Sequence, residues 1–354
     1  MMKNRIKVIE IISDTNFGGA GQYLKSIVEE IDREIFEPII IMPFDSVLRD
    51  MMGNSKVEYC RAINEKSFSL KGMINLYKIM KRIKPCVVHT HGSLSGRLAA
   101  QILGVKNIVY TKHTLSDNNI GWKRQLKIIL NKMLRANVIA ISKSVKLNLI
   151  EEGIKETNIR MIYNGIRIIE TFDTETRLIP IITLVGRLEP IKGHRHMIEI
   201  TRRLTECHRE NFEIKFVGSG SLEPTLKKLV SDYGLPITFS GHVDSIGQIY
   251  ETSDIIVNTS DSEALSYATL EAMMYKKPVV AFDIPGINEV IENGKTGFLV
   301  DYKDYDLFTE YLVRLLKDST LRRNMGESGR QRVIDKFSIE EMINGIETLY
   351  MEEL

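Results

Sequence analysis

The sequence predicts an α/β protein of two domains, each built around a doubly wound parallel sheet. Short β-branched runs alternate with amphipathic helical stretches along the chain, and several runs are apolar without alternation. Strand–helix alternation gives a parallel sheet, and continuous apolar runs are typical of strands covered by helices on both faces. The alternation pauses once near the middle of the 354 residues, and a chain of this length is too long for one ordinary core.

Six strands are expected in the first half of the chain. Helical stretches such as "GQYLKSIVEEI" and "SGRLAAQIL" separate them. Residues 167–179 are polar and lack a clear period, so we expect them to form a linker. The six strand runs are 7–12, 37–43, 86–92, 107–113, 137–142 and 159–165.

The same pattern restarts after the linker, and the last fifty residues have helical periodicity. We therefore expect an N-terminal domain over 1–166, a C-terminal domain over 167–336, and a final helix over 337–354 that packs back on the first domain. Ligands bind beyond the carboxyl ends of the strands in such sheets, which predicts a site in the cleft between two facing domains. The strand runs of the second half are 180–186, 212–220, 237–243, 254–260, 277–283 and 297–300.

Composition and cysteine usage distinguish between membrane-spanning, secreted and cytoplasmic proteins. No run of eighteen apolar residues predicts a membrane-spanning helix, and the N-terminal apolar run is too short and too acidic for a signal peptide. Cys60, Cys86 and Cys207 have neither pairing nor metal-site spacing, as expected of reduced thiols. We expect a cytoplasmic protein.

The two halves carry opposite charge. Residues 1–165 hold 26 Lys and Arg against 15 Asp and Glu, a balance of +11, and residues 166–354 hold 22 against 31, a balance of −9. Two interpretations are open: the halves meet different partners, or their charges steer them together.

A glycine-rich turn follows the first expected strand and opens a helix. Gly18, Gly19 and Gly21 in "NFGGAGQYL" allow close approach of the backbone to a ligand, and a helix N-terminus favours an anion. The spacing is not that of the dinucleotide-binding fingerprint. A tight turn explains these glycines equally well.

Two cations follow the first strand of the second half, in "VGRLEPIKGH". Arg187 and Lys192 at a strand's carboxyl end suit a diphosphate, although a solvated loop would also carry charge. Two further strand–glycine turns, "FVGSGS" with Gly218 and "FSGHVD", are expected to open onto the same edge of the sheet.

Two glutamates eight positions apart lie in "DSEALSYATLEAM". Glu263 falls in the loop after the run 254–260, and Ser266 can cap a helix from about residue 267 to 275 that carries Glu271. A carboxylate can accept two hydrogen bonds from a vicinal diol, so two carboxylates beside a phosphate site indicate two sugars and hence a nucleotide-sugar. A helix-capping role for Glu263 is the alternative.

These motifs together resemble the retaining glycosyltransferases of family 4, also called group 1, with the Rossmann-like two-domain GT-B fold. "GRLEPIKG", "EALSYATLE", "YNGI" and "GINEVIENGKTGFLV" occur in the family's order, and the resemblance covers nearly the whole chain. One departure is visible, because "ALSY" stands where the family commonly has an aromatic residue or leucine followed by glycine or proline. Ser266 is therefore expected to alter sugar selectivity.

The resemblance implies roles for individual residues. Arg187 and Lys192 would hold the donor diphosphate and stabilise the leaving group, Glu263 would accept hydroxyls of the transferred sugar, and Glu271 would accept the ribose diol. The remaining residues implied in donor binding are Gly18, Gly19, Gly218, His242, Val243, Ala264, Leu265 and Ser266.

Histidines of the first domain complete the expected site. The resemblance implies that His91, in "HTHG", contacts the donor sugar beside the reacting carbon. His89 is expected to point the opposite way and to be structural. His113 and Ser142 end neighbouring strands and are expected on the acceptor side.

The expected reaction is hexosyl transfer from a nucleotide-sugar, with a UDP-sugar favoured, to an acceptor hydroxyl. Electrostatic stabilisation of the departing diphosphate is the main expected contribution. We expect no metal requirement, because the sequence has no Asp-x-Asp motif at a strand end and two cations can neutralise the leaving group. No carboxylate in the first domain suits a covalent route, so front-face transfer with retention is expected.

A basic amphipathic stretch, "GWKRQLKIILNKMLRANV" over 121–138, predicts contact with an anionic membrane surface and hence a lipid-linked saccharide acceptor in polysaccharide or glycolipid synthesis. An ordinary core-packed helix is the alternative. Nucleic acid is not an expected partner. Two other functions stay open: a nucleotide-sugar epimerase or hydrolase on the same scaffold, and a non-catalytic nucleotide-sugar sensor.

Overall fold

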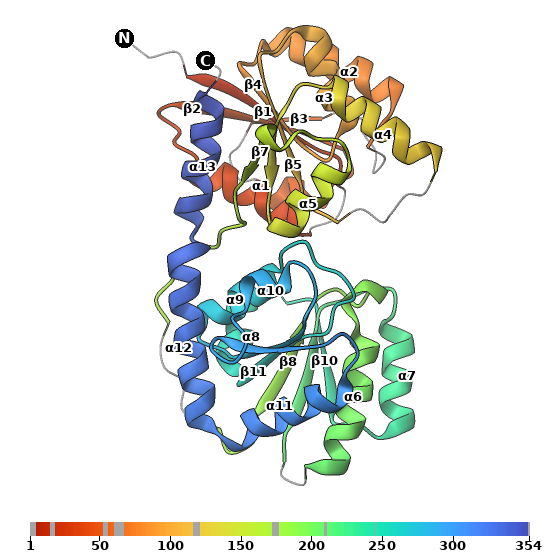
Figure 1. Ribbon diagram of the computed structural model, residues 1–354, viewed down its shortest axis with the longest axis vertical. Helices are drawn as coiled ribbons and strands as arrows, with labels where there is room; N and C mark the ends of the chain where they lie inside the picture. The colour runs from red at the N-terminus through yellow and green to blue at the C-terminus, as the bar shows by residue number, and fades with distance from the viewer. Residues whose placement is uncertain are drawn as a thin grey trace. The chain divides into compact units, whose positions relative to one another are not determined.

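The computed structural model describes residues 5–14, 18–51, 56–59, 67–115, 121–171, 177–208, 211–243 and 245–352, drawn as a ribbon in Figure 1. The chain divides into two compact units. The first contains residues 1–165 together with 339–354, and the second contains residues 166–338. Cys60 and part of the expected linker lie outside the described residues.

The first unit has a seven-stranded parallel sheet in the order β3-β2-β1-β4-β5-β6-β7. Six of its strands are the expected ones. The seventh, β3, lies at the edge and reads "KVEY", four residues of which two are charged, so its sequence carries no apolar run. The strands are β1 Ile6–Ile12, β2 Phe36–Met42, β3 Lys56–Tyr59, β4 Val87–His91, β5 Asn107–Lys112, β6 Asn137–Ala140 and β7 Ile159–Met161.

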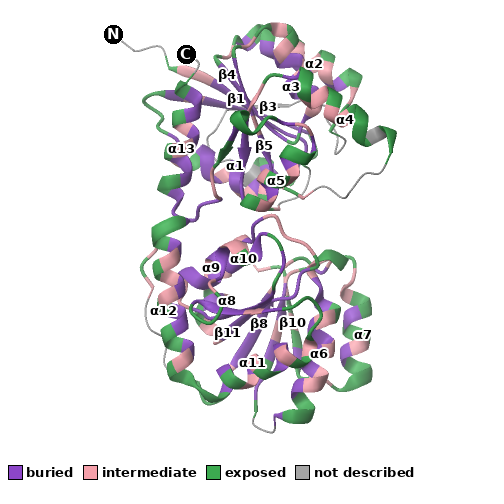
Figure 2. Ribbon diagram, in the orientation of Figure 1, coloured by how far each residue is buried: buried purple, intermediate pink, exposed green. Residues whose placement is uncertain are grey.

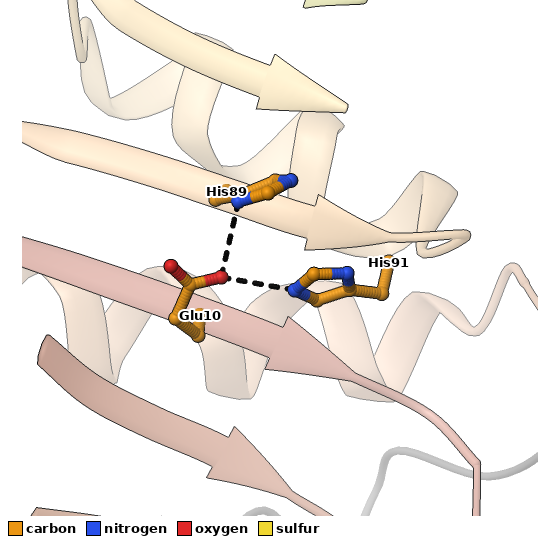
Figure 3. A group of neighbouring side chains, drawn as sticks. All are labelled: Glu10, His89 and His91. Carbon is orange, nitrogen blue, oxygen red and sulfur yellow. Dashed lines mark hydrogen bonds and ion pairs between the residues drawn. The ribbon is translucent and has the colours of Figure 1, made fainter. Parts of the chain in front are cut away.

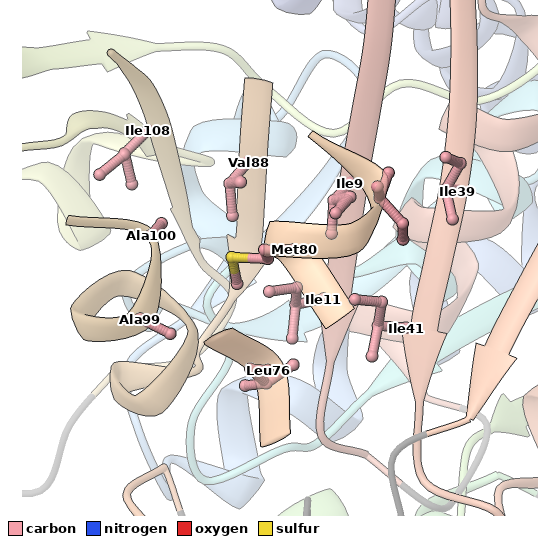
Figure 4. Packing of buried hydrophobic residues seen from close by; sticks show 11 residues of the cluster. Ile9, Ile11, Ile39, Ile41, Leu76, Met80, Val88, Ala99, Ala100 and Ile108 are labelled. Atoms are coloured by element: carbon pink, nitrogen blue, oxygen red, sulfur yellow. The ribbon is translucent and has the colours of Figure 1, made fainter. Parts of the chain in front are cut away.

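Helices cover both faces of this sheet because side chains along a strand alternate between its two sides. Ile9 and Ile11 of β1 pack in one core with residues of α2 and α3 (Figure 4). Ile12 packs on the opposite face against Leu24 and other residues of α1. The helices are α1 Gly19–Glu30, α2 Leu70–Ile83, α3 Leu94–Leu103, α4 Trp122–Met133, α5 Lys143–Glu151 and the C-terminal α13 Ile339–Met351.

The C-terminal helix α13 is an integral part of the first unit. It contacts α1, and its residues Leu349 and Tyr350 are buried. The side-chain amide of Asn107 donates to the carbonyl oxygens of both residues at 3.0 Å. The last helix therefore closes the α1 side of the sheet.

The second unit repeats the architecture with a six-stranded parallel sheet in the order β10-β9-β8-β11-β12-β13. The inner strands of both sheets are largely buried (Figure 2). In each sheet the first strand is central, two strands follow on one side and the rest on the other, which is the doubly wound order. The predicted fold class is thus confirmed. The strands are β8 Ile181–Val185, β9 Glu213–Val217, β10 Ile237–Gly241, β11 Ile255–Asn258, β12 Val279–Phe282 and β13 Gly297–Val300.

The helices of the second unit include a long C-terminal pair, as the periodicity of the last fifty residues predicts. They are α6 His194–Cys207, α7 Glu223–Tyr233, α8 Ile246–Thr252, α9 Tyr267–Met274, α10 Ile287–Val290, α11 Tyr305–Lys317 and α12 Ser319–Lys336.

Candidate active site

Three glycine turns form one layer at the carboxyl ends of β8, β9 and β10. The amide of Gly186 donates to the carbonyl of Val217 at 2.9 Å, and the amide of Gly218 donates to that of Gly241 at 2.8 Å. A Cβ on Gly218 would lie 2.2 Å from the carbonyl oxygen of Gly186, and its φ is +135°. No larger residue fits there. The turns open onto one edge of the sheet, as predicted.

The loop that carries Lys192 is fastened to the end of β11. Gly193 has a φ of +66°, and a Cβ there would lie 1.8 Å from the carbonyl oxygen of Thr259. The amide of Asp261 donates to the carbonyl of Ile191 at 2.8 Å. This packing brings the loops that carry Lys192 and Glu263 together at the carboxyl edge of the sheet.

Lys192 and Glu263 meet across these loops. The ammonium of Lys192 donates to Oε1 of Glu263 at 2.6 Å, and the hydroxyl of Ser260 donates to the same oxygen at 2.8 Å. The residue predicted to bind the diphosphate and the residue predicted to bind the sugar therefore form an ion pair. Arg187 lies exposed on the neighbouring turn. An anionic ligand must compete with Glu263 for the lysine.

Helix α9 begins as the sequence predicts. The hydroxyl of Ser266 accepts a hydrogen bond from the amide of Thr269 at 3.3 Å and another from the side chain of Asn258 at 3.2 Å. Leu265 is buried, and Ala264 contacts the next turn, where a Cβ on Gly286 would lie 2.6 Å from its carbonyl oxygen. The N-terminus of α9 is thus held next to Glu263, so a capping role falls to Ser266 rather than to Glu263.

Glu271 of α9 is a carboxyl group in an apolar setting. The hydroxyl of Tyr250 donates to its Oε2 at 2.9 Å. Burial raises the pKa of Glu271 to about 7, against the smaller opposing effect of that hydrogen bond. The carboxyl group is therefore partly ionised and partly neutral at neutral pH. Perturbed pKa values of this kind are common at ligand-binding sites.

Other predicted donor-site residues lie where the fold leaves backbone accessible. His242 is exposed and Val243 half-buried, directly after β10. Gly18 caps α1 with an ordinary φ of −140°, and nothing lies within 4 Å of a Cβ placed there. Gly19 is exposed. The protein's own packing thus does not require glycine at 18.

A buried polar cluster of the first unit contains Glu10 of β1 with His89 and His91 of β4 (Figure 3), and Tyr350 of α13 joins it. Oε2 of Glu10 lies 2.9 Å from Nε2 of His91 and 3.1 Å from Nδ1 of His89. Oε1 of Glu10 accepts the hydroxyl proton of Tyr350 at 2.6 Å. Nε2 of His89 is 2.7 Å from the hydroxyl of Thr111. These side chains satisfy one another inside the unit.

Glu10 remains ionised in this cluster. Burial by itself would raise its pKa, but the hydrogen bonds and charges of His89 and His91 outweigh that effect and hold the pKa below its usual range. Ligand atoms of Glu10, His89 and His91 are also close enough together to hold a metal ion. Their hydrogen bonds already account for the arrangement.

The structure corrects three predictions for the first unit. Both ring nitrogens of His91 are occupied, by Glu10 and by Nε2 of His113 at 3.0 Å, and its side chain is inaccessible, so it does not fit the predicted contact with the sugar. His89 shares the face of His91, because residues two apart on a strand point the same way. Ser142 is fully buried and accepts the amide proton of Val145, capping α5, so it does not line an acceptor surface.

His113 has a different environment. Its Nδ1 has no hydrogen-bond partner among the described residues, and its ring is half-buried against Tyr23 at a centroid distance of 4.9 Å.

Sequence reasoning missed Glu10, Tyr350 and Tyr250. Glu10 could have been recognised from the sequence, because it is a carboxylate inside the apolar run "KVIEII". Tyr350 and Tyr250 had none, because only tertiary packing brings them to their carboxylates.

Helix α4 turns an apolar stripe toward solvent. Four residues spaced three or four apart form it, with exposed fractions of 72% for Trp122, 47% for Leu126, 52% for Ile129 and 68% for Met133. The alternative of an ordinary helix with its apolar side packed on the core does not fit.

The opposite side of α4 is polar. Lys127 pairs with Glu152 at 2.8 Å, and Asn131 accepts a hydrogen bond from the buried Arg97 at 3.2 Å. Arg124 and Lys132 are exposed. The side chain of Lys123 lies outside the described set. Of the helices within the described ranges, none is both long and apolar enough to cross a membrane.

Comparison with known families identifies the class of protein. Residues 17–168 match the model described as Glycosyltransferase Family 4, and residues 174–332 match the model described as Glycosyl transferases group 1. The two models together span most of the chain. The protein belongs to the group 1 glycosyltransferases.

Individual relatives of the chain are also glycosyltransferases. The chain is 26% identical to the UDP-Gal:alpha-D-GlcNAc-diphosphoundecaprenol alpha-1,3-galactosyltransferase of Escherichia coli, over 99% of this chain and 97% of the relative. It is 25% identical to the capsular polysaccharide biosynthesis glycosyltransferase CapM of Staphylococcus aureus, over 79% and 80%. The structure of Anabaena HepE with UDP and glucose has the same GT-B fold, with a TM-score of 0.83, 20% identity, and coverage of 98% and 99%.

Proposed function

We propose that the protein transfers a hexose from a nucleoside-diphosphate sugar, a UDP-sugar by preference, to a hydroxyl of a lipid-linked saccharide, with retention of configuration. The observation that carries this proposal is the Lys192–Glu263 pair at 2.6 Å beside the N-terminus of α9. A cation and a carboxylate there suit the two halves of the donor, its diphosphate and its sugar.

Residues of the second unit bind the donor in this proposal. Lys192 and Arg187 bind the diphosphate and stabilise the leaving group as negative charge develops on it. Binding releases Glu263 from Lys192, and its carboxylate then accepts hydrogen bonds from sugar hydroxyls. Glu271 accepts the ribose diol. Uridine is favoured because HepE binds UDP in its crystal structure and the E. coli relative, by its name, uses UDP-Gal.

Metal independence is part of the proposal. Lys192 and Arg187 supply two positive charges where the diphosphate would lie, which is the neutralisation that a divalent cation gives in other transferases. Retention by front-face transfer is proposed because Glu10, the carboxylate of β1, is buried and bound by three partners, so it does not suit attack on a sugar.

The acceptor is proposed to be lipid-linked and met at a membrane surface on the cytoplasmic side. The exposed stripe of α4 and the balance of +11 over residues 1–165 support this. An apolar helix face rimmed by Lys and Arg binds anionic lipid. The E. coli relative, by its name, acts on a sugar joined to diphosphoundecaprenol.

Release of nucleoside diphosphate from a panel of nucleotide-sugars tests the proposal. Transferase activity requires release that depends on a lipid-diphosphate saccharide. Release of nucleoside diphosphate without an acceptor would indicate a hydrolase. Conversion of the sugar without such release would indicate an epimerase. Binding of the nucleotide-sugar with neither release nor conversion would indicate a sensor.

A further inference from the structure

A polar network in the second unit joins the loop after β11 to two other elements. Oδ1 of Asp261, in that loop, accepts hydrogen bonds from Nε2 of His196 and from the hydroxyl of Tyr302, each at 2.8 Å. Nδ1 of His196 lies 2.7 Å from the hydroxyl of Tyr305. His196 belongs to α6, Tyr302 follows β13, and Tyr305 begins α11. The side chain of Asp261 therefore ties its loop to α6 and to the segment between β13 and α11.

Aromatic packing fixes the two groups that donate to Asp261. The ring of His196 stands edge-on to Phe282 and to Tyr302, at centroid distances of 5.6 and 6.0 Å. Burial, reinforced by the hydrogen bond to Asp261, raises the pKa of Tyr302 to about 12. Its hydroxyl therefore keeps its proton and remains a donor. Both donors are held toward the same carboxylate oxygen.

The network lies beside the residues proposed to bind the donor. Asp261 is two positions before Glu263. Its amide donates to the carbonyl of Ile191, the neighbour of Lys192, at 2.8 Å. The hydroxyl of Ser260, on the other side of Asp261 in the chain, donates to Oε1 of Glu263 at 2.8 Å. The place of Asp261 therefore determines the backbone position from which Glu263 extends.

Exposure separates this role from ordinary packing. The side chain of Asp261 is 40% exposed, and that of His196 is 16% exposed. Polar pairs at such sites contribute little to the stability of the whole fold, because water screens them and can replace either partner. Their hydrogen bonds still set the geometry of a loop, and a small misplacement of a group that meets the substrate costs rate.

We propose that Asp261 is a positioning residue: held by His196 and Tyr302, it fixes the loop 259–263 so that the carboxylate of Glu263 is presented to the sugar of the donor. This inference rests on the proposed function and deepens it. In that function, other residues bind the diphosphate and the ribose. The anchor should therefore affect the reaction of the sugar and leave the binding of UDP unchanged.

Two substitutions of Asp261 test this role. Asp261→Ala removes the acceptor of both hydrogen bonds and keeps the amide that donates to Ile191. With a UDP-sugar that the parent protein uses, we expect kcat to fall about tenfold, while calorimetry gives the parent's dissociation constant for UDP. Asp261→Asn keeps Oδ1 as an acceptor and should restore most of the lost kcat. An unchanged kcat in Asp261→Ala, or a loss of UDP affinity as large as the loss of kcat, overturns the proposal.

Asp306 supplies a matched control. Its carboxylate pairs with Arg203, so it joins the same helices α6 and α11, and its side chain is 86% exposed. Asp306→Ala should leave kcat at the parent's value. An equal fall in Asp306→Ala would mean that the pairing of the two helices, and not the anchor at Asp261, governs turnover.

The anchor also has a readout that does not depend on activity. Hydrogen exchange in the ligand-free, full-length protein follows the amides of residues 259–263. Exchange there should become faster in Asp261→Ala and return to the parent's rate in Asp261→Asn. Unchanged exchange in Asp261→Ala contradicts the anchoring role. If no UDP-sugar is a donor, the proposed function fails, while exchange still decides whether Asp261 fixes the loop.

Discussion

Lys192 and Glu263 form an ion pair at 2.6 Å. Lys192→Ala removes a cation that stabilises the leaving group, and we expect kcat to fall on the order of a hundredfold. Glu263→Ala also lowers turnover, but it frees Lys192, so free UDP should bind as well as or better than in the parent.

Calorimetry with UDP separates the two roles, and steady-state kinetics with the UDP-sugar measures turnover. Lys192→Ala should weaken UDP binding, whereas Glu263→Ala should not. If Glu263→Ala weakens UDP binding as much as Lys192→Ala, the assigned roles are wrong.

Glu271 makes donor binding depend on pH. Its pKa of about 7 lies above the unfolded value of 4.5, so the native state binds more protons between these values, and its contribution to stability falls as pH rises through that window. The affinity for the donor changes with pH in the opposite direction to stability, because only the ionised carboxylate accepts hydrogen bonds from two ribose hydroxyls. Affinity for UDP should rise, by up to about tenfold, from pH 6 to pH 8.

Glu271→Gln is the matched control, because the amide does not titrate while the phosphates of UDP titrate equally in both proteins. The parent should show a steeper rise than the variant. Equal pH profiles would remove Glu271 from the ribose site.

The sequence predicted the places of the candidate donor-site residues in the fold better than those of the histidines. Arg187, Lys192 and Glu263 lie in loops just after strands, where the rule about strand ends places them without knowledge of packing. The environment of His91 depends on Glu10 from another strand and on Tyr350 from the last helix. Those contacts bridge distant parts of the chain, and no local pattern encodes them.

Among the elements, α4 carries the membrane prediction. Arg124→Glu, Lys132→Glu and Arg135→Glu together should reduce binding to anionic vesicles, because each basic residue near such a surface contributes about 1 kcal/mol. Lys127 is left unchanged because it pairs with Glu152 inside the unit. Binding of the parent should weaken with added salt.

Three exposed cations of the second unit, Lys228, Lys317 and Arg323, give a control of equal charge change. Substituting them with glutamate should affect vesicle binding much less. Sedimentation that shows equal loss in both triple variants would mean that net charge, and not α4, governs binding.

The elements themselves were predictable where burial decides their pattern. The strands with continuous apolar runs match the expected ones. The edge strand β3 was missed because its pairing comes from the backbone and its side chains "KVEY" do not form an apolar run. Helix α4 was recognised as amphipathic, but its orientation depends on Lys127 and Asn131 finding buried polar partners.

Across the whole molecule, the last helix completes the first unit. Tyr350→Phe removes the hydroxyl that donates to Glu10 and contacts His89, both at 2.6 Å, and leaves buried polar groups short of a partner. We expect a loss of about 1–3 kcal/mol of stability. Calorimetric unfolding should show it, whereas Tyr233→Phe at an exposed position should change stability by less than about 0.5 kcal/mol. Equal effects would mean that the hydroxyl of Tyr350 is not structural.

The proposed reaction is transfer of a sugar from a UDP-sugar to a lipid-linked saccharide. The most direct measurement is release of UDP from a panel of UDP-sugars, with and without a lipid-diphosphate saccharide acceptor, and with Lys192→Ala as the control. We predict release from at least one UDP-sugar that requires the acceptor, yields a lengthened saccharide and falls about a hundredfold in the variant. UDP release that does not depend on the acceptor, or equal rates in parent and variant, would contradict the proposed reaction.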